Sequence, residues 1–173
     1  MELKDYIRSI PNFPKEGIIF RDITTLLRNP SAFSDAIDRF HERYKTKHID
    51  FIASIESRGF IFGAALAYSL GVGFVPIRKK GKLPWKTISE EYELEYGTDV
   101  LEIHQDAVSP GNSVLIVDDL IATGGSIKAA CNLIEKLKAN IVEVAVVIEL
   151  VDLGGREKIK PHNLFSLVKF EGE

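Results

Sequence analysis

Two adjacent carboxylates and a glycine-rich turn are the residues of this sequence best suited to chemistry. Asp118 and Asp119 directly follow an apolar run, residues 114–117, which has the pattern of a short buried strand. The sequence ATGGS at residues 122–126, the glycine turn, comes next, and a helical spacing of apolar residues begins at Ile127. The glycine turn is therefore expected at a helix N-terminus, where unpaired N–H groups and the helix dipole favour a phosphate.

The carboxylates would repel that phosphate, so we expect them to meet another part of the ligand. An ionised carboxylate only accepts hydrogen bonds, and the hydroxyl groups of a ribose donate them. A ribose 5-phosphate carries both a phosphate and a diol. The Walker and dinucleotide-binding patterns do not fit, because Ser126 directly follows Gly125 with no lysine between them. The alternative from these residues alone is an ordinary strand–turn–helix unit with surface aspartates.

Composition sets limits on the class of protein. A chain of 173 residues suggests one domain, and its net charge of −3 argues against bulk nucleic-acid binding. The longest apolar runs are too short to span a membrane, and the charged N-terminus does not resemble a signal peptide. The single cysteine, Cys131, lies on the apolar face of the helix after the glycine turn, where we expect it in the core. These features predict a cytoplasmic enzyme.

Strands and helices alternate along most of the chain, which predicts an α/β fold with a mostly parallel, twisted sheet and helices on both faces. Residues 11–27 are expected to be irregular, and residues 83–103 are expected to form an exposed two-stranded ribbon or flap around Gly97. Ser31 is a candidate N-cap for the second helix. The expected strands are 51–55, 72–77, 114–117, 141–150 and 164–168, the expected helices are 3–10, 31–45, 60–70 and 127–137, and residues 153–158 are expected to be a polar connection.

A second polar loop, residues 56–59, follows the strand expected at 51–55. Ligands of open α/β sheets bind at the carboxyl ends of strands, so this loop is expected near the carboxylates. Arg58 can bind an oxyanion through two hydrogen bonds. A run of cations at residues 78–82 follows the next strand and could gather phosphate charge, although such runs are more often solvated.

The segment VLIVDDLIATGGS, residues 114–126, resembles the phosphoribosyl-pyrophosphate motif of type I phosphoribosyltransferases. Five further segments, PNFPKEGIIFRDITTLL, FIASIESRGFIFGAALA, PIRKKGKLP, LEYGTDVLEIH and GREK, are similar to adenine-specific members of that family. The resemblance implies the type I phosphoribosyltransferase fold in a single domain, residues 1–173. It also implies an N-terminal hood at about residues 1–30 and a flexible flap at about residues 79–104.

The same resemblance implies the reaction. Members transfer the phosphoribosyl group of 5-phosphoribosyl 1-pyrophosphate to adenine, giving AMP and pyrophosphate in purine salvage. Mg²⁺ is expected to be held mainly by the substrate and not by side chains alone. The resemblance further implies a homodimer.

Roles for individual residues follow from the resemblance. Glu95 is expected to do acid–base work on adenine, and Asp118 and Asp119 are expected to hold the ribose hydroxyls and favour a cationic transition state. A non-proline cis peptide is expected between Glu56 and Ser57. The residues expected to bind phosphoribosyl pyrophosphate are Glu56, Ser57, Arg58, Gly59, Lys79, Lys82, His104, Asp118, Asp119, Ala122, Thr123, Gly124, Gly125 and Ser126.

Adenine recognition is assigned to the hood and to the end of the central strand. Phe20 is expected to stack on the base, with Leu120 or Ile121 facing its other side. The backbone of Ile19 is expected to bind the base edge, and Arg21 lies beside it. Two alternatives remain open: a phosphoribosyltransferase for a 6-oxopurine, and a regulator that senses phosphoribosyl pyrophosphate without catalysis. The second is disfavoured by the acidic net charge and by the lack of room for a DNA-binding domain.

Overall fold

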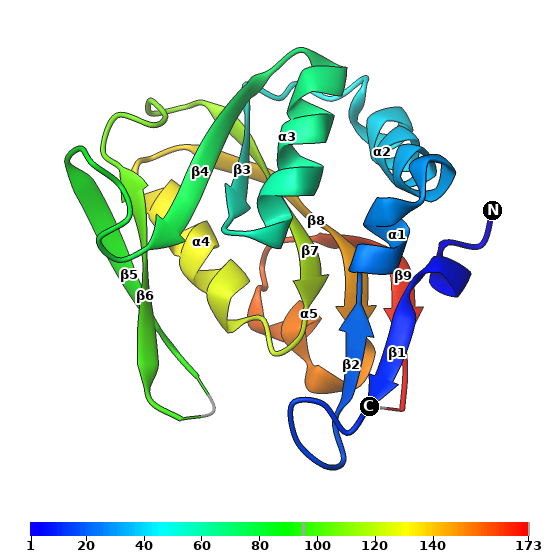
Figure 1. Ribbon diagram of the computed structural model, residues 1–173. Helices are drawn as coiled ribbons and strands as arrows, with labels where there is room; N and C mark the ends of the chain where they lie inside the picture. The colour runs from blue at the N-terminus through cyan, green and yellow to red at the C-terminus, as the bar shows by residue number, and fades with distance from the viewer. Residues whose placement is uncertain (95, 173) are drawn as a thin grey trace.

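A seven-stranded sheet forms the centre of the fold (Figure 1). The computed structural model describes residues 1–94 and 96–172, and its strands lie in the order β5-β6-β4-β3-β7-β8-β9. The strands β4, β3, β7, β8 and β9 are parallel, whereas β6 and β5 pair antiparallel, which confirms the predicted mostly parallel sheet. The strands are β3 (Phe51–Ile55), β4 (Gly73–Lys79), β5 (Thr87–Glu93), β6 (Thr98–His104), β7 (Ser113–Ile121), β8 (Asn140–Leu150) and β9 (Leu164–Phe170).

The register of β3 and β7 brings two polar segments together. The strands pair in parallel, with Ser54 opposite Val117. The loop that follows β3, residues 56–59, therefore lies beside Asp118 and Asp119 near the end of β7. Because ligands of open α/β sheets bind at this edge, the sheet itself positions the predicted site.

Helices cover both faces of the sheet, as predicted (Figure 1). α2 (Pro30–Tyr44) and α3 (Arg58–Leu70) pack on one face, and α4 (Gly125–Lys136) packs on the other. Strands enclosed in this way must be apolar on both sides, which explains their nearly continuous apolar sequences. Within the described ranges, every helix is too short or too polar to cross a lipid bilayer.

The central strand β7 divides the apolar core into two layers. Successive residues of a strand point to opposite faces. Leu115 and Val117 join the layer beneath α2 and α3, whereas Val114 and Ile116 join the layer beneath α4. Cys131 is fully buried in this second layer, as predicted, and burial raises the pKa of its thiol to about 12. The cysteine is therefore a packing residue.

The N-terminal segment differs from its prediction. The helix expected over residues 3–10 ends at Tyr6, and the chain continues as a strand that pairs with residues 19–22. Arg8 fixes this pairing, because its Nε and Nη2 donate to Asp22 Oδ2 over 3.0 and 2.6 Å. Pairing between these distant segments therefore outweighs the local helical spacing of residues 3–10. The expectation of irregular structure in residues 11–27 is also wrong in part, because the segment contains a strand and most of a short helix. The elements here are η1 (Leu3–Tyr6), β1 (Arg8–Pro11), β2 (Ile19–Asp22) and α1 (Thr24–Arg28).

Two further boundaries are corrected by the structure. The N-cap of α2 is Asn29 and not Ser31: the Asn29 side chain accepts a hydrogen bond from Ala32 N over 3.0 Å, and Pro30 occupies the first helical position. The expected polar connection at residues 153–158 overlaps two short helices. These are η2 (Val151–Leu153) and α5 (Gly155–Lys158).

The predicted two-stranded ribbon is present as β5 and β6, and both of its strands are attached to the rest of the fold. β6 pairs with β4, with Arg78 opposite Glu102. β5 lies on α4, where the Glu90 carboxylate accepts hydrogen bonds from Asn132 Nδ2 (3.0 Å) and from Lys136 Nζ. The ribbon therefore extends the sheet and covers one side of α4.

Candidate active site

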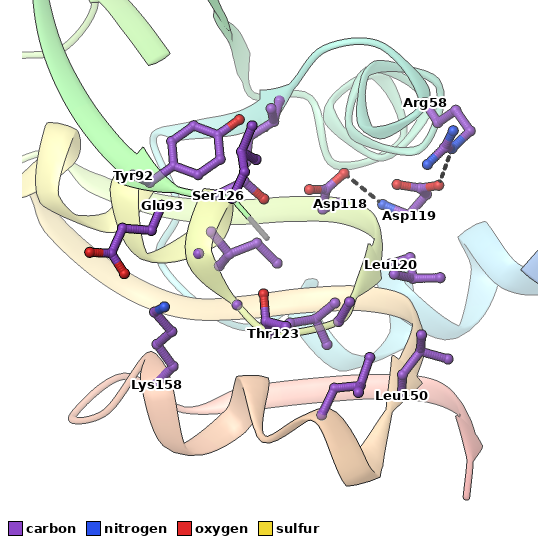
Figure 2. Close-up of a pocket in the computed structure, with 18 of the residues that line it drawn as sticks. Arg58, Tyr92, Glu93, Asp118, Asp119, Leu120, Thr123, Ser126, Leu150 and Lys158 are labelled. Atoms are coloured by element: carbon purple, nitrogen blue, oxygen red, sulfur yellow. Dashed lines mark hydrogen bonds and ion pairs between the residues drawn. The ribbon is translucent and has the colours of Figure 1, made fainter. Parts of the chain in front are cut away.

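A cavity of about 1040 Å³ opens at the carboxyl ends of β3 and β7 (Figure 2). Its walls come from the loop after β3, the end of β7, the glycine turn, the end of β5 and the segment around α5. Most of the residues predicted to bind the donor or the base lie in these walls. They are Ile19, Glu56, Ser57, Arg58, Lys79, Asp118, Asp119, Leu120, Ile121, Ala122, Thr123, Gly124, Gly125 and Ser126.

The two carboxylates lie within β7, because the strand continues past the predicted apolar run to Ile121. Each aspartate is only 7% exposed. Arg58 Nε donates to Asp119 Oδ2 over 2.5 Å, and Asp119 N donates to Asp118 Oδ1 over 2.9 Å (Figure 2). Burial, together with the neighbouring charge of Asp119, raises the pKa of Asp118 well above its usual range. The pair therefore offers hydrogen-bond acceptors whose charge is partly balanced by one arginine.

The loop after β3 is shaped around the carboxylates. A Cβ atom at Gly59 would lie 2.5 Å from Asp118 Oδ1, so only glycine leaves room for that carboxylate. The peptide bond between Glu56 and Ser57 is cis, as expected. Glu56 Oε1 accepts hydrogen bonds from Lys79 N (2.7 Å) and Arg78 Nε (3.2 Å). The Glu56 side chain thus joins this loop to the end of β4.

The glycine turn opens α4 as predicted. Gly124, with φ of 84°, is the N-cap of the helix and has no side chain with which to cap it. The first N–H groups of α4 are therefore left for a ligand, since a helix cannot pair them internally. A Cβ atom at Gly124 would also lie 2.9 Å from Gly155 O, so the turn packs closely against the start of α5. With the hydroxyl groups of Thr123 and Ser126, the turn is suited to hold a phosphate.

Comparisons with known proteins agree with this geometry. Residues 22–171 match the model of the phosphoribosyl transferase domain family. The chain is 58% identical over 173 residues to the adenine phosphoribosyltransferase of Desulfosudis oleivorans, with 100% of both chains covered. The chain belongs to the adenine phosphoribosyltransferase family.

Solved structures of adenine phosphoribosyltransferases share the fold. The crystal structure from Thermoanaerobacter pseudethanolicus is 53% identical with a TM-score of 0.94, and 98% of each chain is covered. The structure from Saccharomyces cerevisiae, complexed with D-2,5-dideoxy-2,5-imino-altritol 1,6-bisphosphate and adenine, is 48% identical with a TM-score of 0.92. It covers 96% of this chain and 97% of its own. The predicted fold class and family resemblance are therefore confirmed.

The end of the ribbon closes one side of the cavity. Tyr92, Glu93 and Leu94 line it, and Lys79 Nζ donates to Tyr92 Oη over 2.6 Å and to Asp99 Oδ2. Burial alone would lower the pKa of Lys79, but the hydrogen bonds to Asp99 and Tyr92 raise it overall. Lys79 therefore carries a full positive charge at the edge of the cavity.

The predicted hood residues divide into two sets. Ile19 lines the cavity together with Gly17 and Ile18. The Phe20 ring packs edge-on against Phe13, with 5.2 Å between ring centroids, and is not in the cavity wall. Arg21 Nη1 donates to Ser9 Oγ over 2.5 Å, and its guanidinium lies 4.0 Å from the centre of the Phe170 ring.

Several other predicted positions lie away from the cavity wall. Lys82 is exposed on the connection before the ribbon. His104 Nε2 accepts a hydrogen bond from Trp85 N over 3.4 Å at the far end of β6. Gly59 is behind Asp118 rather than in the wall. Glu95 lies outside the described residues.

The wall also contains residues that the sequence reasoning missed. Leu150 and Leu153 add apolar side chains to the wall. Leu150 lies near Leu120, and Lys158 extends from α5 into the cavity (Figure 2). The GREK segment, residues 155–158, is the sequence signal for this position, but it assigns no role to Lys158 by itself. Among the described residues, no cluster of three or more histidine, cysteine or acidic side chains could hold a metal ion.

Proposed function

We propose that this chain transfers the phosphoribosyl group of 5-phosphoribosyl 1-pyrophosphate to adenine in the cavity described above, giving AMP and pyrophosphate. One observation carries the proposal for the site. A buried carboxylate pair on β7 and the glycine turn that follows the strand and opens α4 line the same cavity. This arrangement matches the two ends of a ribose 5-phosphate, a diol and a phosphate.

The donor is positioned by the end of β7. The glycine turn binds the 5-phosphate through N–H groups of α4 and the hydroxyl groups of Thr123 and Ser126. Asp118 and Asp119 accept hydrogen bonds from the ribose hydroxyls. Fixing both ends of the sugar orients C1 toward the base, so that the loss of pyrophosphate and the attack of adenine occur in one geometry.

Charge complementarity accounts for catalysis. As the bond from C1 to pyrophosphate lengthens, positive charge develops on the sugar and negative charge on the leaving group. The carboxylate pair lies on the sugar side and favours the cation, whereas Arg58 and Lys79 favour the leaving pyrophosphate. Such preorganised charges act more strongly where they are shielded from water, as the two aspartates are, each 7% exposed.

Adenine binds in the apolar part of the cavity, between the hood and the end of β7. Ile19, Leu120 and Ile121 contribute this surface, which is supported by their place in the cavity wall. The backbone of Ile19 reads the base edge, and Phe20 and Arg21 belong to the same hood. Glu95 handles the proton on adenine when the ribbon closes over the base.

Mg²⁺ fits this donor set as an ion held mainly by pyrophosphate and ribose oxygens. Carboxylate oxygens of Asp118 and Asp119 border the cavity, and hard oxygen ligands and water are what Mg²⁺ prefers. When bound, the ion neutralises charge on the departing pyrophosphate.

We also propose that the chain forms a homodimer. Its one thiol, buried and unpaired at Cys131, suits the reducing cytoplasm that we propose as its location.

Turnover of phosphoribosyl pyrophosphate tests the proposal. The purified chain is offered the donor and Mg²⁺ with adenine, hypoxanthine, guanine or xanthine, each alone, and nucleotide and pyrophosphate are measured. AMP formation with a strong preference for adenine is expected. Turnover of a 6-oxopurine instead would overturn the assignment of the base site, and tight donor binding without any turnover would favour the sensor.

A further inference from the structure

One cation in the cavity wall has no partner among residues 1–94 and 96–172. Three cationic side chains line the cavity within the described residues: Arg58, Lys79 and Lys158. Arg58 is paired with Asp119, and Lys79 is paired with Asp99. In the described parts of the chain, the Lys158 ammonium makes neither a hydrogen bond nor an ion pair, although it extends into the cavity (Figure 2). Its charge is therefore available to a ligand.

The backbone that carries Lys158 is held firmly against the glycine turn. A Cβ atom at Gly155 would lie 2.5 Å from Ala122 O, so the first residue of α5 touches the turn directly. Arg156 then anchors the helix, because its Nε and Nη2 donate to Glu149 over 2.9 and 2.6 Å. Its Nη1 also donates to Leu164 O over 2.8 Å. These contacts hold the backbone of α5, from which the Lys158 side chain extends, against the glycine turn.

We propose that Lys158 binds the 5-phosphate of the phosphoribosyl group, a role that rests on the function proposed above. The glycine turn supplies only neutral donors, namely backbone N–H groups and hydroxyls. A phosphate carrying up to two negative charges binds more tightly when a cation lies beside those donors, because hydrogen bonds between charged groups are stronger than those between neutral groups. Lys158 brings that cation from a separate element of the fold.

The position of Lys158 favours the 5-phosphate over the pyrophosphate. In Figure 2 Lys158 lies on the side of Thr123 and Ser126, whereas Arg58 lies beyond the carboxylate pair at the opposite end. A donor with its 5-phosphate on the glycine turn and its hydroxyls on the carboxylates places its pyrophosphate away from Lys158. The same view shows the Glu93 carboxylate directed toward Lys158, so a latch between these two residues is the competing explanation.

Binding measurements on matched variants test the proposal. The variants are Lys158→Gln, Lys158→Arg and Lys160→Gln. The last is the control, because it removes an equal charge only two residues away. The Lys160 ammonium pairs with Glu157 over 2.5 Å and lies outside the cavity. Affinities for AMP, ribose 5-phosphate, inorganic pyrophosphate and adenine are measured by titration calorimetry. Thermal unfolding of each variant reports on folding.

Lys158→Gln is expected to lower the affinity for AMP and for ribose 5-phosphate by about tenfold, which is the loss typical of one charge-assisted hydrogen bond. Adenine and pyrophosphate are expected to bind as in the wild type, Lys158→Arg is expected to retain most of the affinity, and Lys160→Gln is expected to change nothing. In turnover, KM for the donor rises while kcat stays within about twofold, because the contact is made in both ground and transition states.

Three outcomes would overturn the proposal. One is equal AMP affinity in Lys158→Gln and Lys160→Gln, and another is a loss confined to pyrophosphate. The third concerns the latch between Glu93 and Lys158. Glu93→Gln is expected to leave the affinity for AMP unchanged or to raise it. If Glu93→Gln lowers that affinity as much as Lys158→Gln does, the contact with the ribbon is what matters, and not a contact with the phosphate. If the wild type forms no AMP from adenine, the proposed function itself fails, which is a separate result.

Discussion

Arg58 Nε lies 2.5 Å from Asp119 Oδ2, which joins the loop after β3 to the carboxylate pair on β7. Both residues line the cavity, so a single ion pair orients the group proposed to meet the leaving pyrophosphate and the group proposed to meet the ribose. The hydrogen bond to the Asp119 carboxylate raises the pKa of Arg58 above its ordinary value. The ion pair makes the two halves of the site depend on each other.

Arg58→Gln is therefore expected to reduce kcat/KM for the donor by about 100-fold or more, in the range found when one transition-state hydrogen-bond donor is removed. Steady-state turnover with adenine measures the loss. Arg39→Gln is the matched control, since Arg39 pairs with Asp35 on the surface of α2. A reduction of less than threefold in Arg58→Gln would show that this arginine does not serve the reaction.

Gly59→Ala should reduce both activity and stability. The added Cβ would lie 2.5 Å from Asp118 Oδ1, so the carboxylate must move away from its position in the cavity wall. We expect kcat to fall by about 10- to 100-fold, because small misplacements of a positioning group are costly. The free energy of unfolding should fall by about 1–3 kcal/mol. A variant with normal kcat would contradict the placement of Asp118 at the reacting sugar.

Much of the site could be predicted from the sequence because it is local in the chain. Asp118, Asp119 and the glycine turn follow one another within nine residues, so a strand pattern and a helix start are enough to place them. The β1–β2 pairing was missed because it depends on Arg8 meeting Asp22 across a loop. Lys158 was missed for the same reason: only the folded contact between Gly155 and Ala122 brings it to the cavity.

The Arg8–Asp22 pair should make stability depend on pH in a defined direction. Hydrogen bonds from Thr24 and Arg8 lower the pKa of Asp22 to about 2. A carboxyl group with a depressed pKa in the folded state stabilises the fold above its unfolded pKa of about 3.9, and this stabilisation is lost as the pH falls toward 2. Asp22→Asn should therefore cost about 1 kcal/mol at pH 7 and pH 5, and less at pH 3.

Urea unfolding of the wild type and Asp22→Asn at these three pH values measures the difference. Asp38→Asn, a change on the surface of α2, serves as the control for general charge effects. A gap between wild type and Asp22→Asn that widens at pH 3 would contradict the assigned direction of the pKa shift.

The Arg156–Glu149 pair should contribute strongly to stability. Glu149 is only 3% exposed and also accepts a hydrogen bond from Ser166 Oγ over 2.6 Å. Burial alone would raise the pKa of Glu149, but hydrogen bonds from Arg156 and Ser166 lower it, so the group is buried as a carboxylate. Arg156→Gln leaves that charge without its partner and should destabilise the fold by about 3 kcal/mol.

Thermal unfolding should show this loss as a fall in Tm of about 6–12 °C for a chain of this size. The double variant Arg156→Gln/Glu149→Gln should recover part of the loss, because no unpaired charge remains buried. Equal destabilisation of the single and double variants would show that the ion pair does not act as a unit.

The most direct test of the whole account is the crystal structure of this chain with AMP. We expect the phosphate to lie on the glycine turn within hydrogen-bond distance of Thr123 and Ser126. The ribose hydroxyls should meet Asp118 and Asp119, and the base should lie against Ile19 and Leu120. A phosphate bound at Arg58, with the ribose turned away from the carboxylates, would contradict this placement.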